Sequence, residues 1–275
     1  MNRRTPLGRL GVGVATAAVL LFTLFPVYWM VTTALDPNAS SGARGLLPSS
    51  LGTSNFSFVL GQGGFATFLR NSILVAIGTV VASGALALLA AVAVSRFRFK
   101  FRTSVLVMIL IIQMVPMEAL VIPLFIQVRT LGLLNSLLGL MVVYTGFSLS
   151  FAIWNLRGFV AAVPMELEEA AYLDGASWGR MFWSVLLPLV APGLVATSVF
   201  SFITAWNEFI FALTFVNDDS LYTVSVGLRR FFGQYGTDWG AVMAASTIIT
   251  VPVMVFFVVA QRRLTSGLVS GAVKG

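Results

Sequence analysis

The sequence contains no cysteine and no histidine, and only 10% of its 275 residues are charged. Without cysteine it has no disulfides or thiolate chemistry, and without histidine it has neither a Cys/His zinc site nor a Ser-His-Asp triad. Soluble domains carry about a quarter charged residues, so a water-soluble enzyme is not expected. We therefore expect no catalytic residue, metal site or cofactor site in this chain.

Apolar residues are abundant instead: 58% of the chain is hydrophobic and the mean hydropathy is +0.94. A bilayer core of ~30 Å needs about 20 mainly apolar residues in a helix. Six stretches meet this requirement: Leu10–Thr32, Asn71–Val94, Thr103–Ile126, Leu134–Leu156, Leu189–Leu213 and Ala241–Gln261. The sequence thus predicts an all-α polytopic membrane protein with six transmembrane helices, as a single domain over residues 1–275.

The first stretch follows a basic start and could be a cleavable signal peptide. However, Phe25, Pro26, Tyr28 and Trp29 occupy the place of a small-residue cleavage site. A retained first helix is the favoured interpretation.

The 17 Lys and Arg residues are unevenly distributed between the loops. With six spans and the N-terminus inside, 12 lie on the cytoplasmic side: Arg3, Arg4, Arg9, Arg96, Arg98, Lys100, Arg102, Arg157, Arg180, Arg262, Arg263 and Lys274. The other five lie outside: Arg44, Arg70, Arg129, Arg229 and Arg230. This bias follows the positive-inside rule and predicts cytoplasmic N- and C-termini.

The net charge of +7 raises the alternative of a nucleic-acid partner, above all at the run Arg96-Phe-Arg-Phe-Lys-Phe-Arg102. Between two spans, such a run is better explained as an anchor against anionic lipid headgroups. We therefore expect membrane lipid, and no nucleic acid, at this site.

The cytoplasmic loop 164–188, between the fourth and fifth stretches, is unusual because it is acidic. Glu166, Glu168 and Glu169 follow Pro164, and carboxylates in the first turn suit the positive end of a helix. Gly175 can end this helix, Ser177 can cap a second one, and Pro188 is expected to limit it. The pattern predicts two short helices joined by a glycine turn along the inner membrane surface.

Two explanations of this loop remain open. A helix that binds anionic lipid would be basic on its polar face, whereas this one begins with three of the chain's ten acidic residues. Docking of a cytosolic protein partner is favoured over lipid contact.

The loop also carries a motif: Glu169-Ala170-Ala171, then Gly175, then Val185 and Leu187-Pro188. Their spacing resembles the EAA loop of binding-protein-dependent ABC importers, with Val185 at an Ile-like position. Further likeness to the carbohydrate (maltose-type) branch includes Ile122-Pro-Leu124, Leu131-Gly-Leu133, Ala205-Trp-Asn-Glu208 and the terminal Gly271-Ala-Val-Lys-Gly275. The resemblance extends from about Arg70 to the end of the chain.

The resemblance implies a type I-like permease subunit of the prokaryotic inner or plasma membrane that passes a sugar or oligosaccharide. Its implied partners are cytosolic ATP-binding subunits, a second and different membrane permease subunit, and an extracytoplasmic substrate-binding protein. The residues implied to couple to the ATPase are Glu168, Glu169, Ala170, Ala171, Asp174 and Gly175. ATP would be bound elsewhere, because neither lysine of this chain stands in the Gly-Lys-Ser/Thr sequence of a phosphate-binding loop.

Polar and ionisable residues inside the predicted spans could line a substrate passage, because charges in a bilayer usually face a cavity or a partner. The candidates are Gln113, Glu118, Tyr144, Trp206, Asn207 and Glu208. Amides and carboxylates would bond sugar hydroxyls, and aromatic rings would stack on sugar faces. Equally, Glu118 and Glu208 could stabilise helix packing or reach the outer interface.

The outer loop 214–240 is similarly open to two interpretations. Its charged and aromatic residues could contact a binding protein, or the loop could simply be solvated. These residues are Asp218, Asp219, Arg229, Arg230, Phe231, Phe232, Asp238 and Trp239.

Three other functions are alternatives to a sugar permease. A permease of the same class for a peptide, polyamine or phosphate would share the EAA-like loop. An ion-coupled secondary transporter would show inverted repeats, and the sequence has no evident repeat. An intramembrane enzyme would most often use the missing histidine or cysteine.

Overall fold

The computed structural model describes the backbone of residues 6–40, 47–61, 64–233 and 236–271, and side chains within these ranges from residue 10 to residue 262. The chain forms two compact units: Met1–Phe65 with Leu228–Val251, and Ala66–Gly227 with Pro252–Gly275. Some residues of the predictions lie outside the described residues. They are Arg3, Arg4 and Arg44 of the charge bias, and residues 272–275 of the terminal motif, which include Lys274. The side chains of Arg9 and Arg263 lie outside them as well.

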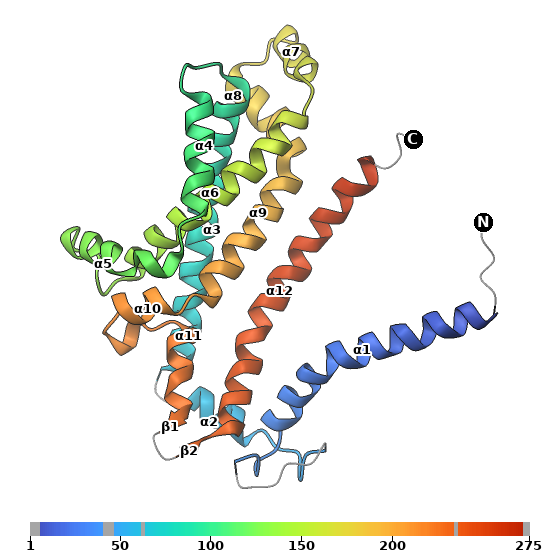
Figure 1. Ribbon diagram of the computed structural model, residues 1–275, viewed down its shortest axis with the longest axis vertical. Coiled ribbons are helices and arrows are strands. Elements are labelled where there is room, and N and C mark those ends of the chain that lie inside the picture. Colours follow the sequence, from blue (N-terminus) through green and yellow to red (C-terminus); the bar gives the residue numbers. More distant parts are fainter. Residues whose placement is uncertain (1–5, 41–46, 62–63, 234–235, 272–275) are drawn as a thin grey trace. The chain divides into compact units, whose positions relative to one another are not determined.

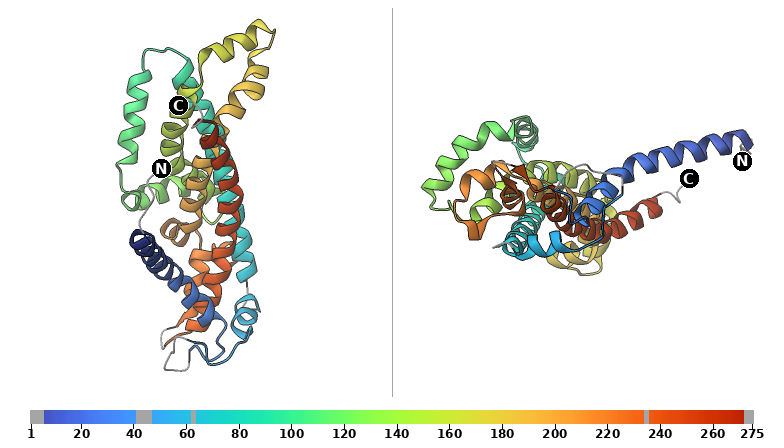
Figure 2. Two further views of the ribbon diagram at one scale, coloured as in Figure 1. Left: turned by 90° about the vertical axis from the view of Figure 1, so that its right-hand side faces the viewer. Right: turned by 90° about the horizontal axis from the view of Figure 1, so that it is seen from below.

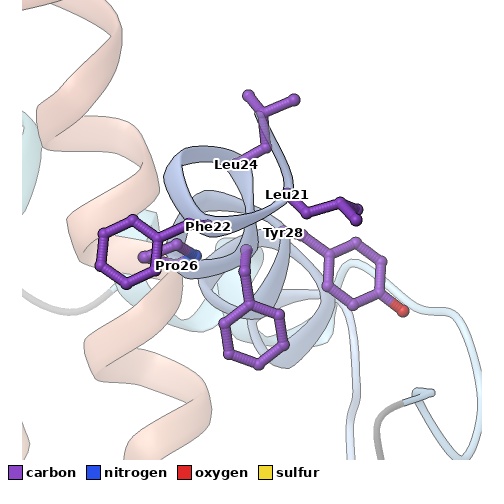
Figure 3. A pocket seen from close by; sticks show the side chains of 6 residues that line it. Leu21, Phe22, Leu24, Pro26 and Tyr28 are labelled. Atoms are coloured by element: carbon purple, nitrogen blue, oxygen red, sulfur yellow. The ribbon is translucent and has the colours of Figure 1, made fainter. Parts of the chain in front are cut away.

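The first unit begins with the long apolar helix α1 (Pro6–Ala34), whose side chains are exposed from residue 10 to residue 28. Pro26 lies inside this helix and removes one backbone donor. Beside it, an apolar hollow of about 670 Å³ is lined only by α1 residues, namely Leu21, Phe22, Leu24, Phe25, Pro26 and Tyr28 (Figure 3). A helix that is apolar all round is typical of a membrane span.

The rest of the first unit is held by polar contacts close to the end of α1. It comprises α2 (Ser54–Gly61), η4 (Leu228–Phe231), β1 (Phe232–Gly233), β2 (Gly236–Thr237) and the start of α12 (Trp239–Gly271). The Asn55 amide donates to the carbonyls of Ala34 and Asp36 at 3.0 and 2.9 Å. Asp238 accepts from Ser40 Oγ at 2.7 Å and from the Ala241 N–H at 3.0 Å, and so caps α12. The antiparallel pair β1–β2 is a small exception to the predicted all-α fold.

The second unit is a helical bundle (Figures 1 and 2). Its long helices are α3 (Phe65–Arg96), α6 (Leu137–Ala162), α9 (Leu187–Asn207) and the later part of α12. Small residues allow close approach inside lipid: a Cβ on Gly193 of α9 would lie 2.4 Å from ring carbons of Phe159 on α6. Ser83 of α3 also donates to Ser201 of α9 at 3.2 Å.

The third predicted stretch, Thr103–Ile126, is wrong as a continuous helix. It is divided among α4 (Arg102–Gln113), η1 (Met117–Leu120) and α5 (Val121–Thr130), with a bend of 96° at the break. Pro116 stands at the break with extended backbone (ψ 130°). Proline disfavours helical backbone at the residue before it and cannot donate a helical hydrogen bond, which explains the break. The described residues contain five helices able to span a membrane, or six if this bent pair is one span.

The fifth predicted stretch, Leu189–Leu213, is wrong at both ends, because the helical run extends from Trp178 to Asn207. The expectation that Pro188 limits the preceding helix is also wrong. α8 (Trp178–Met181) continues through the wide π turn η2 (Phe182–Leu186) into α9. A π turn just before a proline accommodates its ring and missing donor.

The remaining spans agree with their predicted ranges more closely. The second lies within α3, the fourth begins at Leu137 and extends to Ala162, and the sixth lies within α12. The other elements of the second unit are α7 (Met165–Leu173), α10 (Ile210–Phe215), η3 (Asp219–Leu221) and α11 (Val224–Gly227).

The segment that contains η3 and α11 is fixed to α3. Asn71 Nδ2 donates to the carbonyls of Ser220 and Tyr222 at 2.8 and 3.0 Å, and the Val224 N–H donates to Ser72 Oγ at 2.8 Å. Part of the predicted outer loop is therefore anchored to the bundle.

Candidate functional site

The EAA-type loop, residues 164–188, stands at one end of the bundle of the second unit, where α7 projects (Figures 1 and 2). α7 begins after Pro164 with Glu166 and Glu168 in its first turn. Gly175 has φ +79°, the left-handed region that side chains disfavour. Ser177 Oγ accepts the Arg180 N–H at 3.4 Å at the start of α8. The predicted helix, glycine turn and serine cap are confirmed, although the second helix is not short.

The six predicted coupling residues differ in exposure. Glu169, Ala170, Asp174 and Gly175 are exposed, and Ala171 is half-buried against the apolar core of the bundle. Glu168 is only 5% exposed. Its Oε1 accepts a hydrogen bond from Arg96 Nε at 2.7 Å, so this carboxylate already has a partner within the chain.

Apolar residues outside the six predicted coupling residues are also exposed on the EAA-type loop. Leu173 is 89% exposed, beside Tyr172 at 43% and Trp178 at 48%. The available signal in the sequence was the position of Leu173, an apolar residue close to the Gly175 turn in an otherwise acidic segment. The tip of the EAA-type loop is therefore apolar as well as acidic.

A second feature is a hollow of about 410 Å³ in the second unit. Its lining comes from η1 and from the joint between α9 and α10: Met117, Glu118, Thr204, Asn207, Glu208, Phe209, Ile210 and Phe211. Three predicted passage residues, Glu118, Asn207 and Glu208, thus come together from distant parts of the sequence. Thr204, Phe209 and Phe211 were missed because their residue types are common in any span.

Glu208 lies at the joint where α9 ends, and both of its carboxylate oxygens are hydrogen-bonded. Oε1 accepts the Phe211 N–H at 2.9 Å, and Oε2 accepts the Ala212 N–H at 3.1 Å and the hydroxyl of Tyr144. Its carbonyl accepts Ser225 Oγ at 2.7 Å. A carboxylate at the N-terminal turn of α10 meets free N–H groups and the positive end of the helix dipole.

The other predicted passage residues occupy different surroundings. Tyr144 is buried on α6, and Trp206 is buried on α9, with its ring stacked on Phe202 at a centroid distance of 5.4 Å. Gln113, the last residue of α4, is exposed and does not line the hollow. By contrast, the Glu118 side chain is exposed at the hollow.

Together, the fold and these two features define a polytopic helical membrane protein with a projecting loop and, among its helices, a hollow that two carboxylates and an amide help to line. Residues 83–269 match the model of the binding-protein-dependent transport system inner membrane component, and the chain belongs to this family. It is therefore a multi-pass permease subunit of the bacterial inner membrane, of the ABC importer type.

Two relatives match over most of their lengths. The diacetylchitobiose uptake system permease protein DasC of Streptomyces coelicolor is 40% identical over 99% of this chain and 100% of its own. The trehalose transport system permease protein SugB of Mycobacterium tuberculosis is 36% identical, over 94% of each chain.

Among solved structures, a chain from the crystal structure of a bacterial ABC transporter involved in alginate import is similar in fold. It has a TM-score of 0.81 and 23% identity, over 95% of this chain and 99% of that one. At this identity the likeness concerns the fold alone.

Proposed function

We propose that this chain is one of two membrane subunits of an ATP-driven importer for a sugar or oligosaccharide. The observation that carries the proposal is the EAA-type loop, which turns at Gly175 and has an exposed tip at Leu173. This loop lies in a chain that is 40% identical to a diacetylchitobiose permease. Relatives named for trehalose and for trehalose/maltose support a saccharide as the transported solute.

The EAA-type loop would bind a cytosolic ATPase subunit, and a substrate-binding protein would deliver the solute outside. ATP hydrolysis would take place in that separate subunit. The bias of basic residues supports cytoplasmic termini, and it supports a position of the loop on the same side of the membrane as the ATPase.

Within the loop, Glu169, Ala170, Asp174 and Gly175 would contact the ATPase subunit directly, because they are exposed. Glu168 and Ala171 would hold α7 on the bundle. Exposed Leu173 would enter an apolar cleft of the partner.

The hollow would form this subunit's part of the solute passage. The carboxylate of Glu118 and the amide of Asn207 would bond sugar hydroxyls, since both residues are exposed there. Glu208, Tyr144 and Trp206 would hold the wall in shape, and Gln113 would lie on the approach to it.

The test is reconstitution of this subunit with the neighbouring permease, ATPase and binding protein in vesicles. We expect uptake of a labelled disaccharide that requires ATP and the binding protein, with ATPase activity stimulated by the loaded binding protein. Uptake of a peptide, polyamine or phosphate in place of every sugar tested would contradict the saccharide assignment while leaving the ABC mechanism intact.

A further inference from the structure

Arg96, the last residue of α3, reaches two acceptors at the base of the EAA-type loop. Its Nε donates to Glu168 Oε1 at 2.7 Å, and its Nη2 donates to the carbonyl of Val163 at 2.9 Å. The Arg96 and Glu168 side chains are only 11% and 6% exposed. Solvent therefore screens this ion pair much less than a surface pair.

Three helix ends meet at this guanidinium. Arg96 belongs to the C-terminal end of α3, Val163 is the C-cap of α6, and Glu168 lies in the first turn of α7. A cation is favourable at a helix C-terminus and a carboxylate at an N-terminus. Each charge therefore suits the helix end at which it lies.

The pair joins helices that the chain does not connect directly. α7 follows α6 through Pro164 and leads to α9 through Gly175, whereas Arg96 and Glu168 are 72 positions apart. In addition, α3 shares an apolar cluster with α6, α8, η2 and α9, which includes Ala91, Val160 and Phe182. The ion pair is thus a directional polar link from α7 to α3.

We propose that Arg96 is a positioning residue that makes α3 move together with the EAA-type loop when the ATPase subunit closes. The inference rests on the proposed function. A loop held only by its chain neighbours would transmit motion to α6 and α9, which precede and follow it. Through Glu168, the same displacement also reaches α3.

The pair is better suited to a positioning role than to stabilisation. A buried ion pair adds little net stability compared with a well-packed apolar replacement, but the loss of one partner leaves an uncompensated charge. The two hydrogen bonds of Arg96, to Glu168 and to the Val163 carbonyl, fix the direction in which α7 leaves the bundle. Lysine would keep the charge but could not form the same planar fork.

The test compares Arg96→Gln, Glu168→Gln and the double variant in the reconstituted importer, using solute transported per ATP hydrolysed as the readout. Only complexes that retain the ATPase subunit in gel filtration are assayed, so that misfolded protein does not contribute. Arg98→Gln and Glu166→Gln are the matched controls, because both residues are exposed charges close to the pair.

We expect each single variant to lower the transported amount per ATP about tenfold, and the double variant to lower it no further. Arg96→Lys should fall between wild type and Arg96→Gln, and the controls should match wild type. A wild-type ratio in Arg96→Gln, or fully additive losses in the double variant, would overturn the inference. A wild-type complex without binding-protein-dependent uptake would instead contradict the proposed function.

Discussion

The EAA-type loop and the hollow each hold a carboxylate with hydrogen-bond partners inside the chain, but the partners of the two carboxylates differ. Glu168 receives the guanidinium of Arg96, whereas Glu208 receives two backbone N–H groups of α10 and the hydroxyl of Tyr144. The loop lies at helix ends, where a long basic side chain is available. Within an apolar span an added cation is costly. After α9 ends at Asn207, the first turn of α10 supplies free N–H donors instead. The helix break is therefore what accommodates an acidic residue there.

The largest effect is expected at the break. Replacement of Glu208 by Ala removes the acceptor for Phe211, Ala212 and Tyr144, and should lower the free energy of unfolding in detergent by about 3 kcal/mol. Glu208→Gln keeps one oxygen and should cost less. The control Glu166→Ala, an exposed carboxylate, should change stability little. An equal loss in Glu208→Ala and the control would refute the capping role.

The next effect concerns the glycine turn of the loop. Alanine at Gly175 should cost roughly 1–2 kcal/mol, because left-handed backbone is strained for a residue with a Cβ. We expect weaker co-purification of the ATPase subunit and lower stimulated ATPase activity. Gly179→Ala is the matched control, since Gly179 has no positive φ and equally open space. Equal co-purification from both variants would contradict a role for the turn geometry.

A smaller effect is expected from Glu118, which is exposed at the hollow. Glu208, by contrast, accepts a backbone N–H of α10 and so also stabilises the fold. Glu118→Gln should raise the apparent KM for uptake by about tenfold or less, the range expected for the loss of one charged hydrogen bond. Arg129→Gln, an exposed charge on α5, provides the control. Unchanged KM and rate in Glu118→Gln would exclude a passage role for this carboxylate.

The smallest effect lies outside both regions, in the first unit. Hydrogen bonds from the N–H and hydroxyl of Ser49 lower the pKa of Asp36 below its ordinary 3.8. The ionised form is therefore favoured by folding, and the contact persists above pH 3.8 and is lost only as the pH falls below that value. The protection of the Ser49 amide against exchange, relative to its intrinsic rate at each pH, should therefore fall over that acidic range. In Asp36→Asn, the protection of the same amide should show no such pH dependence.

The sequence predicted the loop better than the hollow, and the reason is physical. The Pro164 start, the Gly175 turn and the Ser177 cap are local backbone effects that are visible in consecutive residues. Glu118 and Glu208 were identified individually, because charges in apolar stretches stand out. Their convergence depends on a bend at Pro116 and a helix end at Asn207 that hydropathy alone does not reveal.

Other features required the tertiary structure. The pairing of Arg96 with Glu168 joins positions 72 residues apart, and no local pattern distinguishes Glu168 from its exposed neighbour Glu169. The helical run through Pro188 was missed because proline normally ends or kinks a helix, whereas here a π turn precedes it.

The most direct test of the central claim uses the absence of cysteine from this chain. A single cysteine is introduced at Leu173, which is 89% exposed at the tip of the loop, and is cross-linked within the assembled importer. Leu131→Cys, at a residue that is 69% exposed next to α5, is the matched control. We expect Leu173→Cys to cross-link to the ATPase subunit and Leu131→Cys not to do so. Cross-linking of the ATPase subunit from residue 131, with none from residue 173, would contradict the assignment of residues 164–188 as the docking loop.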